Sequence, residues 1–303
     1  MAAGCGHAMT PPFFRLRQVL RHPALILGVY FLRLLAAIGL SWNWAKILGT
    51  GSIMAYPQRD AELFAPGAAI LLRTIAEQEQ AISRQVSCDL LFVIGLAVAG
   101  SAVSTVALCA LTESQDPSES IRIRNALRMM PKTLAISVVY WLSLTALFFF
   151  AKTLYLLIPA TVYPMLGERG SDIAIVLLAI VVLIVTFVAF VASDLARAIA
   201  VRSKRGSLDA IAHSISCLKR RLGKCLMGAV LWTAPAVLAP AIVECAFSSI
   251  GLQGSTRTMT LLLAHQLIIL ALCVFHLCWW SKAIELVRGI PTPTQELSEA
   301  GND

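Results

Sequence analysis

Apolar residues gather in six long blocks along this chain, with short polar stretches between them. The blocks cover roughly residues 24–41, 90–111, 133–155, 172–195, 225–247 and 259–281. Each has about the 20 residues that an α-helix needs to cross the hydrocarbon core of a bilayer. The pattern predicts an all-α polytopic membrane bundle with six transmembrane helices, built as one integral membrane domain over residues 1–288. The polar tail 289–303 contains Pro291 and Pro293 and is predicted to be a disordered cytoplasmic segment.

Composition agrees with a membrane protein and excludes the usual soluble classes. The 303 residues are 58% hydrophobic and 14% charged, whereas soluble domains carry about 25% charged residues. The formal net charge of +8 would suggest nucleic acid in a soluble protein. Here the basic residues flank apolar blocks, so we expect anionic lipid head groups as partners and no nucleic acid. The eight cysteines show no C-x-x-C pair and no disulfide framework.

The placement of charge predicts the orientation of the spans. Most of the 25 Lys and Arg residues lie before the first, third and fifth blocks, or just after the sixth. Because loops rich in Lys and Arg stay in the cytoplasm, both termini are predicted to be cytoplasmic. Six spans also place both termini on one side, so the charge distribution and the number of spans agree. The predicted location is the cell membrane.

A basic phrase is repeated before the odd-numbered blocks. RLRQVLR at 15–21 matches RIRNALR at 122–128, a proline follows each, and SISCLKRRLGK at 214–224 is a weaker third copy. Each copy predicts an amphipathic helix at the cytoplasmic surface, whose cations reach lipid phosphate. We interpret the copies as three units of surface helix plus hairpin; alternatively, any inside segment next to a span is basic. The predicted head-group contacts are Arg15, Arg17, Arg21, Arg122, Arg124, Arg128, Lys219, Arg220 and Arg221.

An intramembrane polar cluster is the sharpest candidate for a site. Arg33 lies about 15 Å along the first helix from its inner end, at 1.5 Å per residue. A charge at that depth is costly and indicates function. His265, Gln266 and Glu244 lie in or near the outer halves of the last two spans, and are predicted to pair with Arg33. The alternative is that Arg33 reaches the interface or makes one structural ion pair.

A second candidate is the pair Asp194 and Arg197, where the fourth span meets the cytoplasm. Three residues apart on a helix, they share a face. The spacing favours a helix-end ion pair, and a gate or a ligand contact is the alternative.

The sequence shows no motif for catalysis, a metal or a cofactor. G-x-x-x-x-G-K-[ST], H-E-x-x-H and G-x-S-x-G are all missing. Cys273, His276 and Cys278 are close in sequence, but Cys278 points away from His276 on a helix, and no fourth ligand is evident. We therefore expect a protein that is not an enzyme and uses no cofactor.

The basic phrases, together with DLARAIAVRSKRGSLDAIAHSISCLKRRLGK at 194–224, resemble a loose group of bacterial six-span proteins. The chain is similar in pattern to uncharacterised relatives of the membrane domain attached to glycerophosphoryl diester phosphodiesterases. The resemblance rests on surface helices leading into hairpins and on D-x-x-R at the end of the fourth span. It implies a bacterial inner-membrane protein with that fold, and the catalytic domain of the family has no counterpart here.

These observations define a leading function and two alternatives. We expect a non-enzymatic membrane component that engages lipid, or an unspecified protein partner, through its basic surface helices. The main alternative is a small transporter or permease subunit that uses the region of Arg33, His265 and Glu244. Its fifth span would be kinked by Pro235 and Pro240. An enzyme acting on lipid is the third interpretation.

Overall fold

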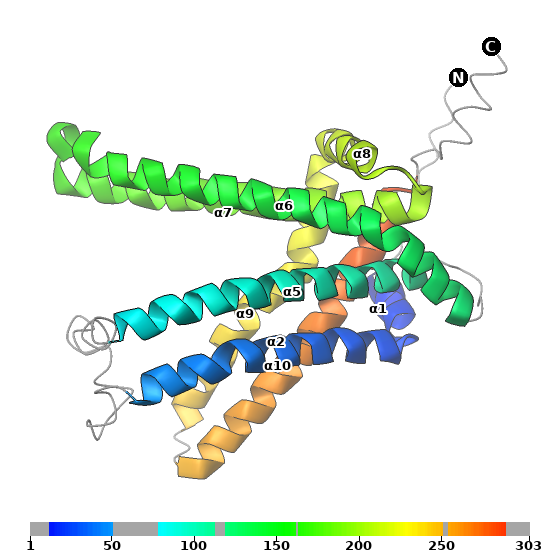
Figure 1. The fold of residues 1–303 in the computed structure, drawn as a ribbon, viewed down its shortest axis with the longest axis horizontal. Coiled ribbons are helices and arrows are strands. Elements are labelled where there is room, and N and C mark those ends of the chain that lie inside the picture. The colour runs from blue at the N-terminus through cyan, green and yellow to red at the C-terminus, as the bar shows by residue number, and fades with distance from the viewer. Residues whose placement is uncertain (1–11, 51–77, 113–118, 162, 251–253, 289–303) are drawn as a thin grey trace. The chain divides into compact units, whose positions relative to one another are not determined.

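The computed structural model describes residues 12–50, 78–112, 119–161, 163–250 and 254–288, and within these ranges the chain is helical without strands (Figure 1). The all-α prediction is confirmed for this part of the chain. The helices are α1 (Pro12–Leu20), α2 (Pro23–Thr50), α5 (Glu79–Thr112), α6 (Glu119–Thr161), α7 (Tyr163–Ser203), α8 (Ser207–Arg220), α9 (Leu222–Ile250) and α10 (Gly254–Leu286). The tail 289–303 lies outside the described residues.

Five helices are long and apolar enough to cross a membrane, among the residues that the structure describes. Their apolar stretches are Pro23–Trp42, Ile94–Thr112, Ile123–Met165, Arg169–Ser203 and Leu263–Leu286. These stretches overlap five of the six predicted blocks. The remaining block, 225–247, lies within α9, which is not one of the five. Five of the six predicted blocks thus lie on helices whose length and composition suit a membrane span, and the sixth span stays a prediction.

The chain divides into two compact units, and each is described by itself. Unit 1 combines Met1–Ile26 with Ser101–Asp303, and unit 2 is Leu27–Gly100. Within unit 2, the indole Nε1 of Trp44 donates to Asp89 Oδ2 at 2.6 Å. Gln85 Nε2 donates to the other carboxylate oxygen of Asp89, also at 2.6 Å. The first of these bonds joins the end of α2 to the beginning of α5, and the second lies within α5.

The core of unit 1 lies at one end of its helices, which we call the basic end. There α1, the N-terminal part of α6, the C-terminal part of α7, α8 and the C-terminal part of α10 meet. The side chains of Leu195, Ile199, Leu277, Trp279 and Val287 are almost fully buried. Burying large apolar side chains stabilises the folded state by about 1.5–3 kcal/mol each. This packing holds the polar groups described below in fixed positions.

Away from the basic end, the paired helices α6 and α7 expose apolar side chains on most sides. Phe149 is 60% exposed, and Leu156, Ile173 and Leu183 are exposed to a similar degree. An exposed apolar surface of this extent needs lipid or a partner to cover it. Near its start α7 is kinked at Gly167, whose φ of 67° favours glycine because the left-handed region is strained for other residues.

The three basic phrases do not have one structure. The first and third copies end at a break, between α1 and α2 and between α8 and α9. The second copy continues into its span without a break, as a single helix α6 of 43 residues. The threefold repeat of a surface helix followed by a hairpin therefore stays a prediction. Pro131 lacks the amide donor and crowds the preceding turn, and α6 changes direction in its N-terminal part (Figure 1).

Candidate functional site

Helix α8 presents three different sides and lies across α6 and α7 (Figure 1). Ala210, Ser214 and Cys217 are buried on one side of it. A second side exposes two apolar residues seven positions apart, Leu208 at 78% and Ile215 at 44%. The third side is polar and consists of Asp209, His213, Ser216 and Arg220. A helix with one side on protein, one apolar and exposed, and one polar suits the surface of a membrane.

Ion pairs order the first turns of α8, and hydrogen bonds with Lys132 join its start to α6. Arg205 Nη1 lies 2.8 Å from Asp209 Oδ2, and His213 Nδ1 lies 2.9 Å from Asp209 Oδ1. Lys132 Nζ donates to the carbonyl of Lys204 at 2.8 Å. The hydrogen bond from Arg205 holds the pKa of Asp209 below its usual value, and His213 acts in the same direction. Asp209 is therefore ionised at neutral pH, and its carboxylate stays negatively charged beside the guanidinium of Arg205.

The predicted head-group residues fall into two groups in the structure. Exposed residues are Arg17, Arg21, Arg124, Arg128, Lys219, Arg220 and Arg221. Among them Arg221 already has a structural contact, because its Nη1 donates to the carbonyl of Leu286 at the end of α10, at 3.2 Å. The side chains of Arg15 and Arg122 lie outside the described residues.

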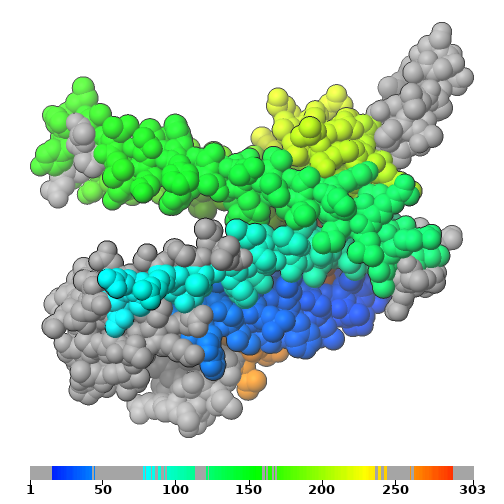
Figure 2. Space-filling view, in the orientation of Figure 1, coloured from blue at the N-terminus to red at the C-terminus, as the bar shows by residue number. Residues whose placement is uncertain are grey.

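Figure 2 shows α8 on the surface of the α6–α7 hairpin, where its atoms stand out from the longer helices. Lys219 and Arg220 lie in the last turn of α8. Cations in the last turn of a helix are favoured there by the negative end of the helix dipole. The exposed cations and the exposed apolar side of α8 therefore occur on one element.

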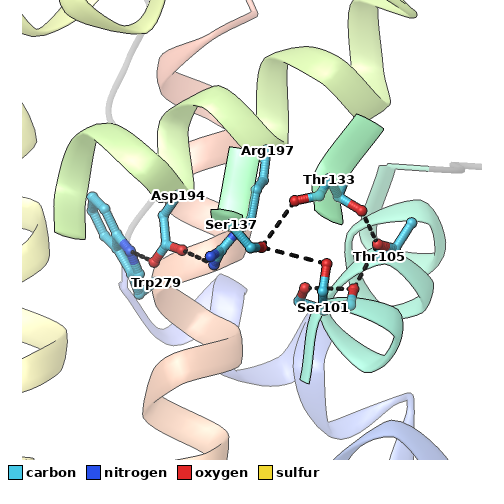
Figure 3. A network of polar contacts seen from close by, with 8 residues as sticks. Ser101, Thr105, Thr133, Ser137, Asp194, Arg197 and Trp279 are labelled. Carbon is cyan, nitrogen blue, oxygen red and sulfur yellow. Dashed lines mark hydrogen bonds and ion pairs between the residues drawn. The ribbon is translucent and has the colours of Figure 1, made fainter. Parts of the chain in front are cut away.

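The pair Asp194 and Arg197 lies in the core of the basic end. Arg197 Nη1 is 3.0 Å from Asp194 Oδ1, and the side chains are 14% and 1% exposed. Trp279 Nε1, on α10, donates to Asp194 Oδ2 at 2.8 Å (Figure 3). Asp194 Oδ1 thus accepts from the cationic guanidinium of Arg197, and Asp194 Oδ2 accepts from the neutral indole N–H of Trp279. A buried carboxylate satisfied in this way joins α7 to α10.

A chain of hydroxyl groups joins α5 to α6 beside this ion pair (Figure 3). Thr105 Oγ1 and Thr133 Oγ1 lie 2.5 Å apart, and both side chains are fully buried. Ser137 Oγ lies 3.4 Å from Ser101 Oγ and donates to the carbonyl of Thr133 at 2.9 Å. Hydrogen bonds of this kind hold helices together where apolar packing alone gives little specificity.

The predicted cluster of Arg33, Glu244, His265 and Gln266 stays a prediction. Arg33 is half-buried in unit 2, whereas His265 and Gln266 are half-buried in unit 1. The side chain of Glu244 lies outside the described residues.

Sequence reasoning found Asp194 and Arg197 but missed their third partner, Trp279. The sequence signal available was the Trp279–Trp280 pair at the inner end of the last block, because a buried indole N–H usually finds an acceptor. Ser101 and Ser104 were noticeable only as small residues in a helix. Which hydroxyls meet depends on how the helices pack.

Among the described residues, no three His, Cys, Asp or Glu side chains come together in a way that could hold a metal ion. No protein-family model, no curated protein and no solved structure matches the chain. The proposal below therefore depends on the geometry of α8 and of the helices around it.

Proposed function

We propose that this chain is a multi-pass protein of the bacterial inner membrane, with both termini in the cytoplasm, that binds anionic phospholipid through its basic surface helices. The proposal includes six spans, with the 29-residue helix α9 as the fifth. It describes a non-enzymatic, lipid-engaging component. The resemblance to the membrane domain attached to glycerophosphoryl diester phosphodiesterases belongs to the same proposal.

The observation that supports this function best is the composition of the exposed part of α8. Leu208 and Ile215 would insert at the level where head groups meet acyl chains. Lys219 follows Ile215 by one turn, so its ammonium group would reach phosphate from the edge of the same side. Each Lys or Arg near an anionic surface contributes about 1 kcal/mol of attraction.

The burial pattern of α7 supports the placement of α8 at a membrane surface. Apolar side chains are exposed from Ile173 to Val185, and from Val191 onward most are buried in protein. The stretch from Arg169 to Ala192 is about 36 Å long at 1.5 Å per residue, enough for a hydrocarbon core of about 30 Å. The hydrocarbon layer would then end near Ser193, where α8 lies across the hairpin.

Transport receives less support from the described residues. A transporter needs a polar site that opens near mid-membrane. A cavity of about 440 Å³ between α7 and α9 is lined by Phe187, Phe190, Val230, Thr233, Ala234 and Leu238. Its hydroxyl, on Thr233, donates to the carbonyl of Ala229. Since this cavity is apolar and Asp194 is paired, we favour lipid binding.

The experiment compares lipid binding by two charge-neutralised variants. Purified protein in detergent is titrated with phosphatidylglycerol, and bound lipid is counted by native mass spectrometry. Lys219→Gln with Arg220→Gln should weaken binding about thirtyfold, since two attractions of about 1 kcal/mol are lost. The control is Lys152→Gln with Arg169→Gln, which removes two exposed charges near the opposite end of the hairpin. Equal affinities for the two variants would contradict the proposal.

A further inference from the structure

A cavity of about 130 Å³ lies between α6, α7 and α8 in unit 1. Aliphatic side chains from all three helices line it, among them Val139, Ala192 and Ile215. Val139 and Ile215 are themselves partly exposed, so the apolar lining is continuous with the exposed surface of the hairpin. The cavity approaches the size of an apolar cavity of about 150 Å³ that binds benzene, so it can hold a short piece of an acyl chain.

Among the residues that the structure describes, one buried hydroxyl lining this cavity has no hydrogen-bond partner. Ser143 and Ser214 also line it, and each donates to a backbone carbonyl on its own helix at 2.8 Å. Ser193 lines the same cavity and is only 7% exposed, yet its Oγ makes no hydrogen bond. Buried polar groups are nearly always satisfied. The unsatisfied donor therefore indicates that an acceptor from outside the chain completes the site.

The depth of Ser193 identifies the kind of acceptor. If α8 lies at the membrane surface, Ser193 lies where the hydrocarbon core ends. At that depth a phospholipid carries the ester carbonyls of its glycerol, with acyl chains on one side and phosphate on the other. An ester carbonyl accepts hydrogen bonds and donates none. Lys219, one turn along α8 from Ile215, would lie on the phosphate side.

We propose that this cavity is a binding site for one phospholipid molecule, in which Ser193 Oγ donates a hydrogen bond to an ester carbonyl and the first methylene groups of that acyl chain fill the apolar lining. The inference rests on the proposed function, because it uses the placement of α8 at the membrane surface. It adds a defined site and a residue that recognises the ester. The rest of that acyl chain would lie along the exposed apolar side chains of α6 and α7.

The test uses two lipids that differ only at the ester. Diester phosphatidylglycerol and its diether analogue have the same head group and chains, but the diether has no carbonyl. The full-length protein in detergent is titrated with each lipid, and bound lipid is measured by native mass spectrometry. One hydrogen bond gives a net gain of about 0.5–1.5 kcal/mol, so the wild type should bind the diester about fivefold more tightly.

Three variants locate the effect. Ser193→Ala should bind the two lipids equally, whereas Ser143→Ala, whose hydroxyl is already bonded to Val139, should keep the fivefold preference. Ala192→Leu fills the cavity and should weaken binding of both lipids. A wild type that binds both lipids equally would overturn the inference, as would an unchanged preference in Ser193→Ala. Ser193 would then be satisfied by water alone.

The proposed function has a separate readout in the same experiment. Lys219→Gln with Arg220→Gln should weaken the binding of both lipids and leave their ratio unchanged. If that variant weakens binding while the wild type shows no preference for the diester, the proposed function stands and the ester site is wrong. If that variant binds both lipids as the wild type does, the proposed function fails, whatever the diester preference.

Discussion

Asp194 shows what a single carboxylate does in the core of unit 1. It is 1% exposed and accepts from Arg197 on its own helix and from Trp279 on α10. An ionised group survives at such a position only because donors replace the water it has lost. The i, i+3 spacing of Asp194 and Arg197 was visible in the sequence. The contact with Trp279, 85 residues away, was not, because it depends on how α7 and α10 pack.

We expect Asp194→Asn to destabilise the protein by about 3 kcal/mol, since it leaves Arg197 in the core without its counter-charge. The thermal unfolding of purified protein in detergent, followed by tryptophan fluorescence, measures the change. Asp172→Asn is the matched control, because Asp172 is an exposed carboxylate on the same helix. The Asp172→Asn variant should change the free energy of unfolding by no more than about 0.5 kcal/mol. Equal unfolding midpoints for the two variants would show that the buried pair does not contribute.

At the scale of elements, contacts between helices come from hydroxyl groups as well as from apolar packing. Thr105 on α5 and Thr133 on α6 form one such contact, with both side chains fully buried. The sequence predicted helices in both places. It could not predict that these two threonines face each other, because a hydroxyl on a helix can equally well bond to its own backbone.

A double-mutant cycle measures this contact. Thr105→Val and Thr133→Val, made singly and together, should show a coupling free energy of about 0.6 kcal/mol, as hydrogen bonds between membrane helices do on average. Unfolding in mixed detergent micelles supplies the free energies. Thr145→Val and Thr153→Val form the control pair, because these exposed hydroxyls each donate to a carbonyl of α6. A coupling free energy no larger than that of the control pair would contradict a stabilising role for the Thr105–Thr133 hydrogen bond.

The three basic phrases show how far an element can be predicted from its pattern. Helix α8 was predicted as an amphipathic surface helix, and it ends at Arg220 before α9 begins at Leu222. In the second phrase the same reasoning predicted an amphipathic surface helix, and in the structure this segment continues into the span as part of α6. Apolar periodicity indicates which side of a helix is buried. It does not say whether a helix ends, because that depends on whether neighbouring helices compensate for an internal proline.

For the whole molecule, the prediction concerns topology. Reporter proteins fused after residues 120 and 210 should lie on the same, cytoplasmic side of the membrane, and a fusion after residue 165 should lie on the other side. The reason is the concentration of Lys and Arg around the first two positions. Alkaline phosphatase and green fluorescent protein fusions report the two sides. Fusions 120 and 210 on opposite sides would contradict both the orientation and the number of spans.

The sequence by itself determined that this chain is helical and that its helices are long and apolar enough to cross a membrane. Those properties follow from the length and composition of each block, because a helix satisfies its own backbone hydrogen bonds wherever it lies. Only the tertiary structure decided that Trp279 completes the Asp194 site, that Thr105 meets Thr133 and that Ser193 faces a cavity. Those relations arise when separate helices pack, and packing depends on the shapes of side chains far apart in sequence.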